Sequence, residues 1–137
     1  MLEAMRSPKK KHRSMKAIEK ELWHLCRIIT FKRYGTDCFT CPQKNLQGAN
    51  LQCGHAYPKG ALGASMKYDL RILRPQCFIC NIHHGGMGAV FWNTLAVTTK
   101  NSRALFDECR SSKGRPVKAR DHYTHLIDTY TKLLSEV

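Results

Sequence analysis

The sequence is short of acidic residues and contains no long hydrophobic run. Only 10 Asp and Glu accompany 23 Lys and Arg in 137 residues, and the stretch between Glu21 and Asp107 holds just two carboxylates, Asp37 and Asp69. This shortage disfavours catalysis by a pair of carboxylate-held metal ions. No apolar run approaches the roughly 20 residues needed to cross a bilayer, so we expect a soluble protein with no membrane partner.

The cysteine content and the first residues indicate a reducing compartment. Seven cysteines are an odd number, and residues 1–20 are polar and basic, unlike a secretory signal. The sequence therefore favours a cytoplasmic location. A chain of this length can form one compact domain but hardly two.

The positive charge is concentrated at the start of the chain. The formal net charge is +13, and residues 1–34 hold ten Lys or Arg against three Glu. A polyanion is the obvious partner, because phosphate contacts release condensed counterions; a solvated tail that serves only solubility is the alternative. We predict a flexible basic arm over residues 1–13 and a single domain over residues 14–137.

Hydrophobic periodicity predicts helices at both ends of the domain. From Ser14, a plausible N-cap, apolar residues recur at helical spacing to about Tyr34, and Gly35 supplies a stop. Further helices are expected over residues 89–99, around 105–109 and over 121–137. The last could pack on the first helix or on another subunit.

Two C-x-x-C pairs bracket the middle of the chain: Cys38-Phe39-Thr40-Cys41 and Cys77-Phe78-Ile79-Cys80. Four thiolates at this spacing are typical of one tetrahedral structural Zn²⁺ site; disulfides or free thiols are the alternatives. The remaining cysteines, Cys26, Cys53 and Cys109, lack partners at ligand spacing and are interpreted as buried core residues. Trp92 is expected to pack on the zinc layer.

Between the two pairs the pattern predicts two strands and a loop. Residues 51–57 form a short run bounded by turns, with His55 near its end. Residues 58–65 form an exposed connection that could admit a nucleic-acid strand, and residues 66–75 return to pair with the first strand. A helix is expected from Cys80, with Asn81 and His84 on one face.

These residues together resemble a known family. The order Cys38-x-x-Cys41, Cys53-Gly54-His55, Tyr68-Asp69, Gln76-Cys77-x-x-Cys80-Asn81 and glycines after His84 is similar to zinc-stapled HNH (ββα-metal, His-Me finger) endonucleases, and most closely to the NinG (Rap) type of phage recombination nuclease. The resemblance covers about residues 22–95, with a motif core over 38–88. It implies an α+β fold with a small ββα-metal core flanked by N- and C-terminal helices.

The resemblance also implies roles for individual residues. His55 would be the general base that activates water against a DNA phosphodiester, beside one Mg²⁺ or Mn²⁺ held by Asn81 with His84 or His83. Asp69 is the sole central carboxylate that could help to hold this ion; a salt bridge to Arg71 or Arg74 is an equal alternative. We expect DNA contacts from the cations of the loop and return segment, Lys59, Lys67, Arg71 and Arg74. A phage protein acting in the host cytoplasm is implied.

Two departures from the family pattern leave other functions open. The motif asparagine, five residues before Cys77, is replaced by Ile72, which can neither orient an imidazole nor bind metal. Gly54 stands where many relatives carry an acidic metal ligand, although Gly-His variants occur. The alternatives are a non-catalytic zinc-knuckle DNA-binding protein and an RNA-binding zinc knuckle. The sequence does not define the oligomeric state.

Overall fold

The computed structural model describes residues 13–136, which form a small, mostly helical α+β protein with one two-stranded sheet. Short 3-10 turns and one π-helical turn, η4 (Ile79–His83), connect the longer elements. The helices and strands are α2 (Met15–Tyr34), β1 (Gln52–His55), α3 (Ala64–Lys67), β2 (Leu73–Gln76), α4 (Gly88–Thr98), α5 (Ser102–Ser111) and α6 (Ala119–Glu136). The predicted flexible arm lies, apart from Arg13, outside the described residues.

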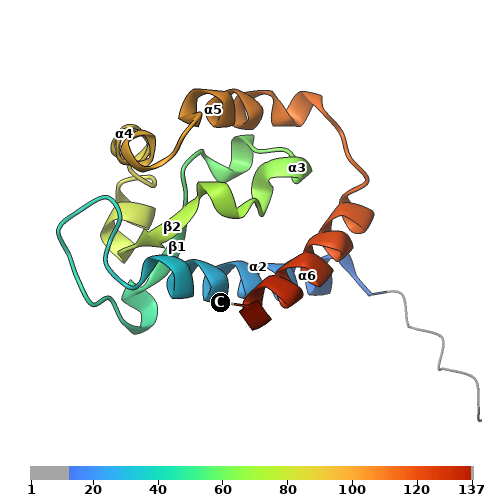
Figure 1. The fold of residues 1–137 in the computed structure, drawn as a ribbon, viewed down its shortest axis with the longest axis horizontal. Coiled ribbons are helices and arrows are strands. Elements are labelled where there is room, and N and C mark those ends of the chain that lie inside the picture. The colour runs from blue at the N-terminus through green and yellow to red at the C-terminus, as the bar shows by residue number, and fades with distance from the viewer. Residues whose placement is uncertain (1–12, 137) are drawn as a thin grey trace, which may run out of the picture.

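The elements are arranged in three layers. In Figure 1, α2 and α6 lie side by side as one layer, the β1–β2 hairpin and α3 lie in the middle, and α4 and α5 cover the opposite side. None of the helices within the described part of the chain has both the length and the apolar character that a membrane span requires.

Helix α2 begins and ends where its capping residues predict. The Ser14 side chain accepts a hydrogen bond from the Ala17 N–H at 3.1 Å, and so satisfies one of the free amides of the first turn. Gly35 ends the helix with φ of 79°, a conformation that glycine adopts without a Cβ clash, and donates to the Phe31 carbonyl. The predicted helix is confirmed.

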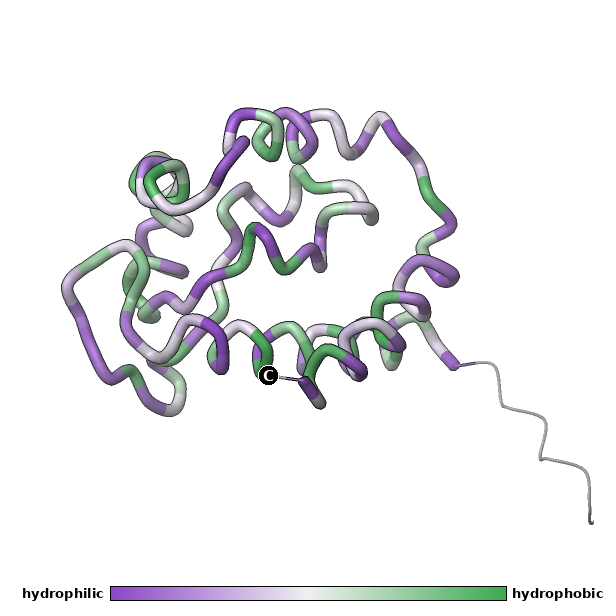
Figure 2. The backbone as a smooth tube through the Cα atoms, viewed as in Figure 1, coloured by the Kyte–Doolittle hydropathy of each residue, from purple (hydrophilic) through white to green (hydrophobic). Residues whose placement is uncertain are grey.

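The larger core lies between α2, α6 and the sheet. Leu22, Cys26 and Ile29 of α2 are fully buried in it, and hydrophobic and hydrophilic residues alternate along both helices (Figure 2). The Tyr130 hydroxyl of α6 donates to the Tyr68 carbonyl at 2.7 Å. The sequence left open whether the last helix packs on the first helix or on another subunit, and in the structure α6 packs on α2.

The sheet is a short antiparallel pair in which Gln52 lies opposite Gln76 and His55 opposite Leu73. The predicted return strand over residues 66–75 is wrong for its first part, which folds into α3 and a 3-10 turn instead. The reason is local: the Asp69 carboxylate accepts from the Arg71 N–H at 2.9 Å and stabilises the turn.

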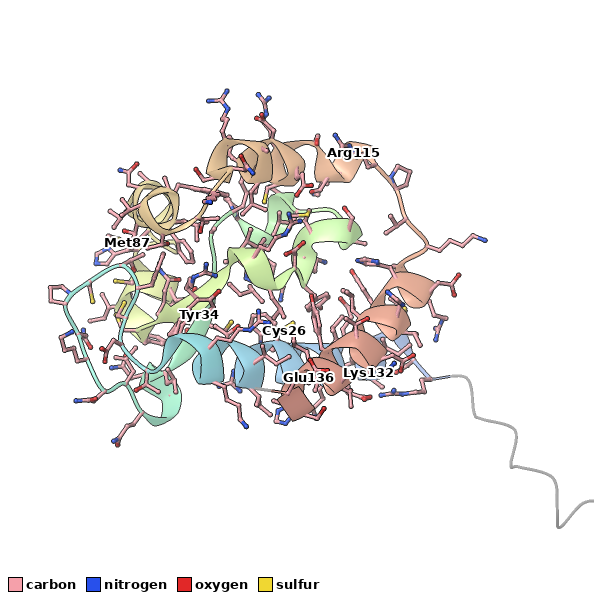
Figure 3. All side chains as sticks on the ribbon, viewed as in Figure 1. Cys26, Tyr34, Met87, Arg115, Lys132 and Glu136 are labelled. Carbon is pink, nitrogen blue, oxygen red and sulfur yellow. The ribbon has the colours of Figure 1, made fainter. Side chains whose placement is uncertain are left out.

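A second core fills the space between the hairpin and α4–α5, with Ile72, Phe91 and Leu95 fully buried. The prediction that Trp92 packs on the cysteine layer is wrong. Its ring lies against Phe106, with centroids 5.2 Å apart, because α5 returns over α4. Met87 packs beside the cysteines instead, where Figure 3 shows sulfur atoms gathered near its label.

Candidate functional site

The four predicted cysteines converge on one point. Cys38 and Cys41 lie on the loop after α2, Cys77 follows β2, and Cys80 lies in η4; all four Sγ atoms are within 4.8 Å of one another. The Sγ atoms of Cys41 and Cys77 are 3.7 Å apart. A tetrahedral ion with Zn–S bonds of about 2.3 Å requires sulfurs about 3.8 Å apart. The cluster could therefore hold a metal ion such as zinc.

Local hydrogen bonds prepare this cluster for a cation. The Cys77 N–H donates to Cys38 Sγ at 3.3 Å, and the Cys80 N–H donates to Cys77 Sγ at 3.4 Å. Burial opposes thiolate formation at Cys38, but hydrogen bonds from Cys77 and Thr40 outweigh it and lower its pKa to about 6. Burial raises the pKa of Cys80 to about 12, a cost that a bound divalent cation would remove.

His55 stands at the end of β1 with its ring fixed on two sides. Its Nε2 lies 2.9 Å from the Lys67 carbonyl oxygen, and its ring stacks on Trp23 with centroids 5.3 Å apart and planes 7° apart. Since a carbonyl only accepts, Nε2 carries the proton and Nδ1 keeps the lone pair. Burial lowers the pKa of His55 to about 4, and the charges of Lys59 and Lys67 also lower it. The imidazole is neutral at pH 7.

The ring of His55 opens onto a pocket of about 320 Å³. Asn81 from η4 and Lys59 from the loop after β1 line the same pocket, and Trp23 forms another wall. Asn81 Nδ2 donates to Gln52 Oε1 at 2.7 Å, which ties the π-helical turn to β1. The predicted pair of His55 and Asn81 thus meets in one depression.

The other two predicted catalytic metal ligands lie elsewhere. His84 lines a separate depression with Cys41, Cys77 and Cys80, on the cysteine side of η4. The Asp69 carboxylate is engaged by Arg71, whose Nη2 lies 2.8 Å from it and also 2.8 Å from Glu108. This is the salt-bridge alternative that the sequence left open.

The donors at the His55 pocket do not by themselves fit a preformed Mg²⁺ site. Mg²⁺ takes six oxygens in near-octahedral geometry and is usually held by carboxylates and phosphates. Within residues 13–136, the only side-chain oxygen donors on this pocket are neutral, the Asn81 amide and the Tyr57 hydroxyl, and no carboxylate lines it. An ion there would need most of its ligands from a substrate phosphate and water.

The place of the motif asparagine is filled by a buried hydrophobic side chain. Ile72 is fully buried in the second core, and its carbonyl accepts from the Ala56 N–H at 2.8 Å. The task of orienting His55 falls to the Lys67 carbonyl, a backbone group that leaves no trace in the pattern of side chains. Sequence reasoning allowed for a carbonyl in this role but could not identify it.

Gln76 belongs to the motif quoted from the sequence, but the sequence assigned it no role. Its Nε2 donates to Thr40 Oγ1 and to the Gly86 carbonyl, both at 2.9 Å, and Thr40 Oγ1 in turn lies 3.6 Å from Cys38 Sγ. The Gln76 side chain lies directly over Gly54: a Cβ built on Gly54 would be 1.7 Å from Gln76 Oε1. A side chain at position 54 would therefore force the Gln76 amide to move. The sequence contained one signal of this contact: a glycine within a strand, here Gly54, often marks a place where another group packs closely against the backbone.

The four predicted DNA-contacting cations differ in availability. Lys59 is exposed, and its Nζ lies 5.5 Å from the centre of the Trp23 ring, while Lys67 is partly buried. Arg74 is only 5% exposed; its guanidinium lies 4.0 Å from the centre of the Tyr34 ring and donates to the Leu73 carbonyl. With Arg71 held by two carboxylates, Lys59 is the cation of this set nearest the His55 pocket.

Comparison with protein-family models, curated proteins and solved structures gives no match.

Proposed function

We propose that this protein is a zinc-stabilised endonuclease of HNH type that hydrolyses DNA phosphodiesters with His55 as general base. One observation carries the proposal: a neutral, ring-stacked imidazole, whose Nδ1 has no hydrogen-bond partner among residues 13–136, lines a pocket that Asn81 and Lys59 also line. In this reading the four-cysteine cluster holds a structural Zn²⁺. The ion fixes the turn that carries Asn81 against the strand that carries His55.

The chemistry assigned to His55 follows from its hydrogen bond. Nδ1 accepts a proton from water as the water oxygen attacks phosphorus, and the 3′ oxygen leaves. The Lys67 carbonyl, 2.9 Å from Nε2, stabilises the imidazolium as it forms, because it accepts from the Nε2–H that becomes more acidic. An entering phosphate adds negative charge to the pocket and so raises the pKa of His55 from its low value in the free protein.

Binding of the phosphodiester is assigned to Lys59 and to the surplus of positive charge. Lys59 lies on the pocket wall beside His55, and the chain carries a formal charge of +13. Long-range attraction to a polyanion follows from that charge and weakens as salt is added. A divalent ion, Mg²⁺ or Mn²⁺, would enter with the substrate, since the neutral oxygens of the pocket cannot hold it alone.

A second function, DNA binding without cleavage, is favoured by one specific observation. In the described part of the chain no acidic side chain lines the His55 pocket, so a metal-dependent active site would lack the usual anionic ligand. In that case the four-cysteine cluster and the basic surface would serve binding alone.

Cleavage of supercoiled plasmid separates these functions. The nuclease proposal expects nicked or linear product with Mg²⁺ or Mn²⁺, and His55→Ala should slow it by about 10²- to 10⁴-fold. His125→Ala is the matched control, because His125 is exposed on α6 and lies outside the pocket; it should cut at the wild-type rate. DNA binding without any cutting by the wild type would instead support the binding function, and equal cutting by both variants would refute His55 as the general base.

A further inference from the structure

A second pocket, of about 540 Å³, lies between α4, α5 and the segment after β1. Three aromatic rings line it: Tyr57 and Phe106 have centroids 5.6 Å apart, and Trp92 and Phe106 5.2 Å apart, both in edge-to-face arrangements. All three side chains are partly exposed. Flat π surfaces open to solvent suit a planar aromatic ligand.

This aromatic pocket adjoins the His55 pocket. The segment Ala56, Tyr57 and Pro58 lines both, as does Gly88 at the start of α4. The chain runs directly from His55 into this shared wall. A ligand bound in the aromatic pocket would therefore lie near the His55 pocket.

The charge of the rim indicates that such a ligand is anionic. Arg103 of α5 lines the pocket with its side chain 85% exposed, and its Nε lies 3.6 Å from an Asp107 carboxylate oxygen. Lys59 stands on the adjoining pocket, and no carboxylate among residues 13–136 lines either depression. Asn93 adds an amide that can donate to or accept from a base edge.

We propose that the aromatic pocket binds one unpaired nucleobase of a DNA strand, stacked on Trp92 and Tyr57, while the adjoining phosphate lies at His55. The inference rests on the proposed function for the placement of the phosphate. Bases inside a duplex are stacked on their neighbours and cannot enter such a pocket. The substrate class is therefore DNA with an unpaired base, as in a bulge.

The test measures binding by the zinc-loaded protein without added Mg²⁺ or Mn²⁺, so that cleavage plays no part. Three labelled 20-base-pair DNAs are compared by fluorescence anisotropy: fully paired, with one bulged base, and with a bulged abasic site. The wild type should bind the bulged base most tightly. Trp92→Leu should weaken this binding by about 5- to 150-fold, the equivalent of one lost stacking contact, and should leave the paired DNA within about 2-fold.

A matched control and a second readout keep the test independent of folding defects. Phe78→Leu removes an exposed ring between Cys77 and Cys80, outside the aromatic pocket, and should bind all three DNAs as the wild type does. In Trp23→Phe protein, Trp92 is the sole tryptophan. Its fluorescence should be quenched by the bulged base and not by the abasic site.

The outcomes for the pocket and for the nuclease can be told apart. Equal binding of the bulged and abasic DNAs would overturn the pocket assignment even if plasmid is cut. A wild-type dimer that Trp92→Leu dissociates would do the same, because it would mean that the pocket binds a second copy of the chain. Base-dependent quenching of Trp92 in a protein that never cuts DNA would support the pocket and count against the proposed nuclease.

Discussion

Replacing Gly54 with alanine tests whether Gln76 fills the place of a side chain before His55. The new Cβ would lie 1.7 Å from Gln76 Oε1 and 2.6 Å from Cδ, so the amide must move. That movement breaks its two buried hydrogen bonds, to Thr40 and to Gly86. At about 0.5–1.5 kcal/mol for each bond and about 1–3 kcal/mol for overpacking, the free energy of unfolding should fall by about 2–6 kcal/mol.

The double variant Gly54→Ala/Gln76→Ala separates the clash from the lost hydrogen bonds. With the long side chain removed, the Cβ no longer meets Oε1, so the double variant should be less destabilised than the two single changes together, by about 1–3 kcal/mol. Gly60→Ala is the matched control: its Cβ meets nothing within 4 Å, and the change should stay below about 1 kcal/mol.

Urea unfolding followed by far-UV circular dichroism at a fixed free zinc concentration supplies these free energies. Two results would show that Gln76 does not occupy the space beside Gly54. One is a Gly54→Ala protein as stable as Gly60→Ala. The other is strict additivity in the double variant, because it would mean that the alanine does not touch Gln76.

Three further predictions concern the metal, a pKa and a buried hydroxyl. The purified protein should bind one Zn²⁺ per chain, and chelation should abolish cooperative unfolding; Cys41→Ser should remove tight binding, and full occupancy in that variant would contradict the cluster. The pKa of His55 is about 4, below the value of 6.5 in the unfolded chain, so the unfolded state takes up a proton first as the pH falls from 6.5 to 4. The free energy of unfolding should therefore drop over this range, by at most roughly 3 kcal/mol. His55→Gln should flatten this part of the pH profile, and an unchanged slope would count against the buried neutral imidazole. Tyr130→Phe should lower the free energy of unfolding by about 1–2 kcal/mol, because it removes the bond to the Tyr68 carbonyl, and a neutral result in urea titration would contradict that bond.

Local signals in the sequence were enough to predict the first helix and the cysteine cluster. Helix α2 follows from apolar spacing with Ser14 and Gly35 at its ends, and each of these acts through its nearest neighbours in the chain. The spacing of the two C-x-x-C pairs likewise places two sulfurs on each tight turn. The apolar residues of α6 recur at helical spacing in the same way. The sequence did not decide whether this helix packs on the first helix or on another subunit, and in the structure it packs on α2.

Features set by tertiary packing could not be predicted from the sequence pattern. Residues 66–72 have the alternating apolar and polar pattern of a strand, yet a hydrogen bond to the Asp69 carboxylate stabilises a turn there. The sequence pattern also predicts an exposed Arg74, but its guanidinium packs on the Tyr34 ring. His84 and Asn81 are three residues apart, but the wider π-helical turn presents them to different depressions. Which groups meet His55 is decided by residues far away in the chain, such as the carbonyl of Lys67.

The rate of plasmid cleavage by zinc-loaded protein with Mn²⁺, compared between the wild type and His55→Ala, decides whether His55 is the general base of a nuclease. The wild type should cut, and the rate should be at least about 100-fold lower in a variant that still folds and binds DNA. A wild-type protein that binds DNA without cutting it, or a variant that cuts equally fast, would show that His55 does not have this role.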